Sequence, residues 1–349
     1  MLNGSPYPKS FASDNHTGVH PAVLAAIGAA NTGDAPAYGD DRWTHDFEAK
    51  VKEVFGEGAA GFAVFNGSGA NMVGLAQTLR RPFDAIICPD TAHIATGEAG
   101  AAERLLGVKL FTVSTPLGKL VPSDVTKVLD ALEGSNQPRP TAVSISQVTE
   151  LGTCYTPDEV SALADVAHAH GLLLHMDGAR LANAAAFLGC PLRDFTTDAG
   201  VDVVNFGGTK NGALAAEAVI FLSATLAEGL PLLRRQSLQL ASKMRFISAQ
   251  LTALLTDDLW RANADHANAM SRRLADGVSD LPGLSIHYPV ESNAVFATLP
   301  PEAIPVLQSM YSFHVWDKSE SVVRWMTAFD TTPAHVDDFI ADIRKVLNA

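Results

Sequence analysis

Over the first 230 residues, short apolar segments rich in Val and Ile alternate with longer segments of helical pattern, and this alternation constrains the fold more than any other feature. Strands this apolar must be covered on both faces, which is typical of a mostly parallel sheet flanked by helices. In such a sheet, ligands bind beyond the carboxyl ends of the strands. The segments that we interpret as strands are GFAVF (61–65), DAIICPD (84–90), TAVSISQVT (141–149), LLLHMD (172–177) and VDVVNFGG (201–208).

The rest of the chain has a different pattern. Residues 232–275 contain few helix breakers and predict one long helix that connects two domains. Three strand-like segments follow (284–290, 293–300 and 322–329), and then a helix that begins at Pro333. We therefore expect a large α/β domain over 21–250, a connecting helix that runs to about 275, and a small α+β domain over 276–349.

Composition excludes several classes of partner. The net charge is −13, and a nucleic acid or an anionic membrane would require clustered Lys and Arg instead. The N-terminal residues are polar, and no apolar run reaches the roughly 18 residues of a membrane helix. The three cysteines are far apart and suggest neither a disulfide framework nor a metal knuckle. We expect a soluble, unprocessed, cytoplasmic protein that binds a small molecule, without a metal.

Three chemical groups follow the predicted strands. NGSGAN (66–71) combines glycines, a serine hydroxyl and a helix N-terminus, which together could bind a phosphate, although an ordinary tight turn explains it equally well. Asp177 closes a hydrophobic strand and needs a cationic partner, for which Arg180 is the nearest candidate. Lys210 follows the next strand, where a lone lysine usually extends to water.

Taken together, these groups are more informative than each alone. An anion site, a carboxylate and a lysine at the ends of three strands are what pyridoxal phosphate requires: the phosphate lies at the helix N-terminus, the ring nitrogen pairs with the carboxylate, and the aldehyde forms a Schiff base with the lysine. A dinucleotide-binding oxidoreductase is the alternative, with NGSGAN as its fingerprint, but the segment lacks the GxGxxG spacing.

The sequence resembles the fold-type I pyridoxal phosphate enzymes, and within them the low-specificity L-threonine aldolases of the β-eliminating lyase superfamily. The resemblance covers about residues 10–335 and implies that residues 1–20 form an N-terminal segment that reaches the active site. The matching segments are FASDNHTGVHPAVLAAI (11–27), GDAPAYGDDRWTHDFEAKV (33–51), NGSGAN (66–71), TAHIATGEAG (91–100), HMDGARLANAA (175–185), GGTKNGA (207–213) and VVRWMTAFDTT (322–332).

The resemblance also implies roles for individual residues. Lys210 would bind the cofactor covalently, Asp177 would pair with its ring nitrogen, and His93 would stack on the ring. The phosphate would be bound by Gly67, Ser68 and Gly69. The substrate carboxylate would be bound by Ser13, Arg180 and Arg324, where the planar guanidinium groups suit a two-oxygen anion.

The implied reaction is the retro-aldol cleavage of L-threonine, L-allo-threonine and related β-hydroxy-α-amino acids, such as phenylserine, to glycine and an aldehyde. His93, or a water that it orders, is the expected base. Some members of the family carry a second histidine near SQVTELGT, where this chain has Gln147, Thr149 and Glu150. Glu98 could assist, but we expect it to be an exposed helix carboxylate. Another fold-type I reaction (β-elimination, transaldolation or racemisation) would use the same residues.

Enzymes of this fold usually build each site from two subunits, so the resemblance implies a homo-oligomer, a dimer of dimers. A neighbouring subunit would then contribute Tyr38, Lys243 or Arg245 near the phosphate. A basic run on a helix is more often simply solvated, which remains the alternative for Lys243 and Arg245.

Overall fold

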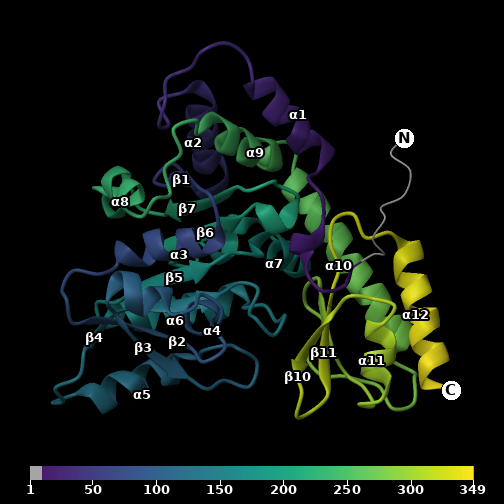
Figure 1. The fold of residues 1–349 in the computed structure, drawn as a ribbon. Helices are drawn as coiled ribbons and strands as arrows, with labels where there is room; N and C mark the ends of the chain where they lie inside the picture. Colours follow the sequence, from purple (N-terminus) through teal and green to yellow (C-terminus); the bar gives the residue numbers. More distant parts are fainter. Residues whose placement is uncertain (1–9, 349) are drawn as a thin grey trace.

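The computed structural model describes residues 10–348, which fold around two β-sheets (Figure 1). The larger sheet has seven strands, which lie in the order β1 (Ala60–Val64), β7 (Glu217–Phe221), β6 (Val203–Gly207), β5 (Leu173–Asp177), β4 (Arg139–Ser146), β2 (Asp84–Pro89) and β3 (Lys109–Val113). Six of these strands run parallel, and β7 pairs antiparallel with both of its neighbours. The expected mostly parallel sheet is therefore confirmed.

Helices cover both faces of this sheet, as its apolar strands require. One face packs mainly against α2 (Arg42–Phe55), α6 (Pro157–Ala169), α7 (Leu181–Leu188) and α9 (Arg245–Leu255). The other face packs against α3 (Gly67–Ala76), α4 (His93–Thr96), the π-helix η2 (Ala102–Leu106) and α8 (Leu230–Gln236). The remaining helices of this part are the 3₁₀-helices η1 (Asp14–His16), η3 (Leu192–Phe195), η4 (Thr209–Asn211) and η5 (Ala224–Ala227), and α1 (Pro21–Ala30) and α5 (Pro122–Leu132).

The smaller sheet is antiparallel, with strands in the order β10 (His314–Asp317), β11 (Val322–Met326), β9 (Ala294–Thr298) and β8 (Ser285–Ile286). It packs against α10 (Leu259–Val278), α11 (Ala303–Gln308) and α12 (Pro333–Leu347), as Figure 1 shows in yellow and green. Pro333 is the first residue of α12, and Thr332 caps it by accepting from the N–H of His335. The expected α+β architecture is observed here, while the domain boundaries themselves stay predictions.

The single long helix expected over 232–275 is wrong. This stretch contains three helices, α8, α9 and α10, because the chain leaves helical geometry twice. Leu238 has a φ of 60°, and Asp257 and Asp258 have φ values of 51° and 53°. Aspartate tolerates this left-handed conformation through local hydrogen bonds of its short side chain, which a count of helix breakers does not detect.

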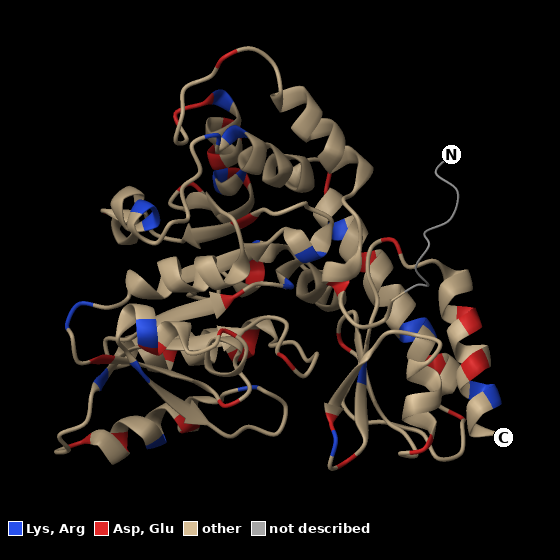
Figure 2. Ribbon diagram, viewed as in Figure 1, with Lys and Arg blue, Asp and Glu red and all other residues tan. Residues whose placement is uncertain are grey.

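Charged residues of both signs are interspersed along the ribbon in Figure 2, and Lys and Arg do not gather in one segment of it. Within residues 10–348, no helix is both long enough and apolar enough to cross a membrane.

Candidate active site

Three loops meet at the carboxyl edge of the large sheet. β1 leads into the N-terminus of α3, β5 ends at Asp177, and β6 leads into η4, which contains Lys210. β1, β5 and β6 run in the same direction, so these three ends lie on one edge. The structure therefore brings the three predicted cofactor contacts to the same side of the sheet.

The N-terminus of α3 presents free backbone donors. Asn66 caps the helix by accepting from the N–H of Gly69 at 2.7 Å, which leaves the N–H groups of Gly67 and Ser68 without a partner in the described chain. No atom lies within 4 Å of where a Cβ of Gly67 would be, whereas the amide of Gln239 lies against Gly69. Of the three residues predicted to bind phosphate, Gly67 and Ser68 offer donors, and Gly69 gives its N–H to the cap.

Asp177 is buried, and its carboxylate is held by two donors. Asn71 donates from Nδ2 to Oδ2 at 2.8 Å, and the N–H of Ala179 donates to Oδ1 at 3.0 Å. Asn205 in turn donates to the Asn71 carbonyl oxygen at 2.5 Å. Sequence reasoning missed both asparagines, although each is a polar residue within an otherwise apolar segment, and such a residue must find a hydrogen-bond partner.

His93 begins α4 and is fixed at two points. Its Nδ1 lies 2.9 Å from Oε1 of Glu98, and its backbone N–H donates to Oε1 of Glu150 at 2.8 Å. The hydrogen bond to Glu98 raises the pKa of His93, against the opposing effect of partial burial. Asn71 also donates to the same Glu98 oxygen, at 2.8 Å, so hydrogen bonds connect His93 to Asp177.

The expectation that Glu98 is an exposed helix carboxylate is wrong. Only 8% of Glu98 is exposed, and its Oε2 is buried without a partner in the described chain. Helix α4 ends at Thr96, and Gly97 serves as its C-cap. Because the helix stops two residues before Glu98, the carboxylate turns inward rather than toward solvent.

Lys210 lies in η4, directly after β6. Burial lowers the pKa of its ammonium group, and the nearby guanidinium of Arg180 lowers it further, while Asp14, Asp177 and Glu217 act in the opposite direction. The described chain offers no hydrogen-bond acceptor to the ammonium group of Lys210. Such an amine loses its proton, and becomes a nucleophile, at a lower pH than a solvated lysine.

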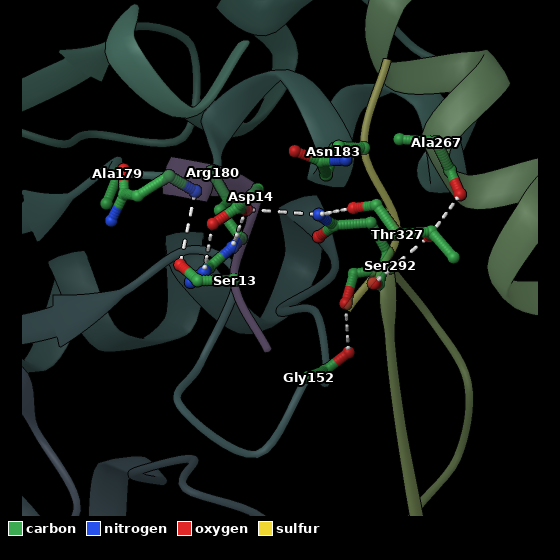
Figure 3. A network of polar contacts seen from close by, with 12 residues as sticks. Ser13, Asp14, Gly152, Ala179, Arg180, Asn183, Ala267, Ser292 and Thr327 are labelled. Atoms are coloured by element: carbon green, nitrogen blue, oxygen red, sulfur yellow. Dashed lines mark hydrogen bonds and ion pairs between the residues drawn. The ribbon is translucent and has the colours of Figure 1, made fainter. Parts of the chain in front are cut away.

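Arg180 pairs with Asp14 and not with Asp177, the partner considered from sequence. Its Nε and Nη2 donate to the two carboxylate oxygens of Asp14 at 2.7 and 2.9 Å. Asp14 also accepts from Nδ2 of Asn293 at 3.1 Å. Burial opposes both charges, but the pairing outweighs it, raising the pKa of Arg180 and lowering that of Asp14. Figure 3 shows Asp14 between Arg180 and the cluster around Thr327 and Ser292.

A second arginine approaches from β11. Arg324 donates from Nη2 to the carbonyl of Ala12 at 3.3 Å, and its guanidinium lies over the ring of Trp316. Its Nε is buried without a partner in residues 10–348. Burial and the charge of Arg180 lower its pKa to about 10. Two nearby guanidinium groups with an unused donor form a suitable place for an anion. Ser13 lies in the chain between Ala12, which Arg324 contacts, and Asp14, which Arg180 contacts.

The three residues predicted to act in a neighbouring subunit lie together in this chain. The N–H of Tyr38 donates to the carbonyl of Ser242 at 3.0 Å, one residue before Lys243. Arg245 donates to the carbonyl of Gly33 at 3.1 Å. None of these contacts, within the part of the chain that the structure describes, reaches the groups described above.

Comparison with known proteins identifies the family of this chain and then its group within that family. A profile of the β-eliminating lyase family matches residues 10–300, so the chain belongs to that family. Within it, the chain is a member of the low specificity L-threonine aldolase group. A low specificity L-threonine aldolase from Pseudomonas aeruginosa is 41% identical over 98% of this chain and 99% of its own length, and one from another Pseudomonas species is 41% identical over the same shares.

A solved structure agrees with the sequence comparisons. A threonine aldolase from Leishmania major superposes with a TM-score of 0.92 at 28% identity, and the match covers 97% of this chain and 100% of that one. The resemblance to the low-specificity threonine aldolases and the expected fold-type I fold are therefore confirmed. The roles of individual residues are not tested by these similarities and stay predictions.

Proposed function

We propose that this chain cleaves L-threonine, L-allo-threonine and related β-hydroxy-α-amino acids, such as phenylserine, to glycine and an aldehyde, with pyridoxal phosphate as cofactor. The observation that carries the proposal is the convergence of Lys210, Asp177 and two arginines, Arg180 and Arg324, in a chain of this family. Pyridoxal phosphate supplies an electron sink for the pair of electrons released when the Cα–Cβ bond breaks.

The residues at the sheet edge fit this cofactor. The free N–H groups of Gly67 and Ser68 suit its phosphate, with Gly69 completing the turn. Asp177 accepts hydrogen bonds at both oxygens, from Asn71 and from the N–H of Ala179, so its carboxylate is held in place to pair with the ring nitrogen. Lys210, with its lowered pKa, would bind the aldehyde carbon.

The two arginines and Ser13 would bind the substrate carboxylate. Arg180 is held by Asp14 through Nε and Nη2, which leaves Nη1 to face a ligand. Arg324 has an unused buried donor, and an anion beside it would compensate the mutual repulsion of the two guanidinium groups. When the arginines hold the substrate carboxylate, the other substituents of Cα take fixed positions relative to the cofactor. Their positions decide which bond to Cα breaks.

His93 would lie against the ring and handle the hydroxyl proton. Its Nδ1 is used by Glu98, so Nε2 is the atom free to exchange a proton with the substrate or with a water. His93, Glu98 and Asp177 lie close enough to bind a cation. We assign the group to the cofactor instead, because the amide of Asn71 already donates to both carboxylates.

We place the enzyme in the cytoplasm as a homo-oligomer, a dimer of dimers, in which a neighbouring subunit brings Tyr38, Lys243 or Arg245 toward the phosphate. Helix α1 supports this assembly: it contains no charged residue, and most of its surface is exposed, including 53% of Leu24. A helix of this composition is typical of a surface that another chain covers.

The direct test compares wild type with Lys210→Ala, with Lys109→Ala as an exposed control. Wild type with pyridoxal phosphate should show a visible absorbance band that borohydride removes, and should convert L-threonine to glycine and acetaldehyde. Lys210→Ala should lack both properties while melting cooperatively, and Lys109→Ala should keep both. Pyruvate and ammonia as products would indicate a β-elimination instead, and retained cleavage in Lys210→Ala would refute the assignment.

A further inference from the structure

A buried carboxylate lies directly beneath the loop that contains Lys210. Glu217 is the first residue of β7 and is only 7% exposed. Its Oε2 accepts from the N–H of Gly208 at 3.1 Å, and its Oε1 accepts from the N–H of Thr209 at 3.3 Å. No role in the cofactor or substrate contacts above accounts for it, and an unpaired buried charge is costly, so its retention needs an explanation.

The position of Glu217 in the sheet is as specific as its hydrogen bonds. Within β7, Glu217 pairs with Gly207 of the neighbouring strand β6 on one side and with Val64 of β1 on the other. It therefore lies between the strand that leads to Lys210 and the strand that leads to the phosphate-binding turn. Thr209 connects the same loop to the residue before Glu217, because its hydroxyl accepts a hydrogen bond from the N–H of Ala216 at 3.2 Å.

Glu217 also acts on Lys210 through charge. Among the ionisable groups in the described chain, Lys210 is the one that most affects Glu217, and Glu217 is one of three carboxylates, with Asp14 and Asp177, that favour the ammonium form of Lys210. Arg180 opposes them. Asp14 and Asp177 have other partners, Arg180 and Asn71, whereas the hydrogen bonds of Glu217 all go to the lysine loop.

We propose that Glu217 is a positioning residue for Lys210: its carboxylate fixes the backbone of Gly208 and Thr209, and its charge favours a proton on Lys210 Nζ. The inference rests on the proposed role of Lys210 as the cofactor lysine. Burial raises the pKa of Glu217 to about 7, so its charge is present chiefly above that pH. Glu217 thus contributes, together with Asp14 and Asp177, to the pH range over which Lys210 changes from ammonium to free amine.

The test measures how fast cofactor-free protein captures added pyridoxal phosphate as a function of pH, by visible absorbance. In this step, the free amine of Lys210 attacks the aldehyde carbon, a carbon–nitrogen double bond forms, and the oxygen leaves as water with the two amine protons. Only the unprotonated amine reacts, so the pH midpoint of the rate reports the pKa of Lys210.

Glu217→Gln should move this midpoint to lower pH, because the loss of a nearby negative charge destabilises the ammonium form. Thr209→Val disturbs the same loop without changing its charge, so it should slow capture without moving the midpoint. Glu159→Gln serves as the control: like Glu217, Glu159 accepts a hydrogen bond from a backbone N–H, but it lies at the exposed end of α6, where it pairs with Lys119. It should behave as wild type.

The outcomes separate this inference from the proposed function. If wild type forms no borohydride-sensitive band, the proposed function fails. If wild type forms the band and the Glu217→Gln midpoint equals that of wild type, the role of Glu217 is refuted. Should Glu217→Gln not fold, Glu217→Asp keeps the charge but shortens the side chain, and capture by this variant should be slower at every pH. A wild-type rate for Glu217→Asp would overturn the positioning role.

Discussion

At the scale of single residues, the site depends on one amide that holds two carboxylates. Asn71 donates from Nδ2 to both Glu98 and Asp177, and its carbonyl oxygen accepts from Asn205. Both carboxylates accept from Asn71, and the tautomer of His93 that matches this arrangement carries its proton on Nδ1 and donates it to Glu98. The chain of hydrogen bonds thereby fixes which nitrogen of His93 remains free.

This arrangement predicts the effect of Glu98→Gln. Since the hydrogen bond to Glu98 is the main cause of the raised pKa of His93, the neutral amide should lower that pKa. NMR titration of labelled histidine in the cofactor-free protein measures this, with His93→Gln to assign the signal. Glu103→Gln, an exposed neighbour in η2, should leave the signal unchanged. An unaltered His93 titration in Glu98→Gln would disprove the dependence.

Sequence reasoning identified residues at strand ends better than residues that depend on tertiary contacts. The meeting of Lys210 and Asp177 could be predicted because parallel strands place their carboxyl ends on one edge. Asn71 and Glu98 could not, since their roles depend on where α3 and the end of α4 pack. The partner of Arg180 was also missed: the nearest acid in sequence is Asp177, whereas the acid that binds it, Asp14, comes from a distant segment.

At the scale of elements, two helical glycines offer a matched comparison. Gly28 in α1 has no atom within 4 Å of the position where a Cβ would be. Gly277 in α10 has the Cδ1 of Ile340, from α12, at 2.4 Å from that position. Gly28 thus only lowers the helix propensity of α1, whereas Gly277 permits the close approach of α10 and α12.

We therefore expect opposite effects of substitution by alanine. Gly28→Ala should raise the free energy of unfolding by about 1 kcal/mol, because alanine favours the helix. Gly277→Ala should lower it by about 1 kcal/mol, because displacing Ile340 outweighs the same gain. Denaturant unfolding at one protein concentration measures both. Equal stabilisation by the two substitutions would show that α12 adjusts without cost.

The element boundaries that sequence reasoning missed have local causes. The segment over 232–275 lacks Gly and Pro at the two places where it breaks, so no usual breaker marks them. The breaks use Leu238 and two aspartates in left-handed conformations instead. By contrast, the start of α12 was predictable, since Thr332, Pro333 and the cap to His335 are local in sequence.

At the scale of the whole molecule, the surface around helix α1 is apolar and exposed. Helix α1 borders a cavity of about 520 Å³, and the residues around the cavity are mostly small or apolar, among them Ala26, Trp43 and Ala253. Leu24 projects from the same helix and is half exposed. In the proposed homo-oligomer, a second copy of this chain would cover both the helix and the cavity.

The prediction is that Leu24→Glu weakens self-association by at least about tenfold, because a carboxylate would be buried without a partner. Sedimentation velocity over a range of protein concentrations measures the change. Val306→Glu adds the same charge to an exposed position on α11 and should leave the mass unaltered. A monomeric wild-type protein, or an oligomer insensitive to Leu24→Glu, would contradict this view of the surface.

The antiparallel strand β7 also determines which ligands can reach both ends of the site. It separates β1 from β6, so the helix N-terminus after β1 and the backbone of Lys210 are two strand spacings apart, roughly 10 Å. The lysine side chain covers part of this distance, and a ligand that contacts both ends must span the rest. The order of strands therefore sets how far a ligand must extend to contact both the α3 N-terminus and Lys210.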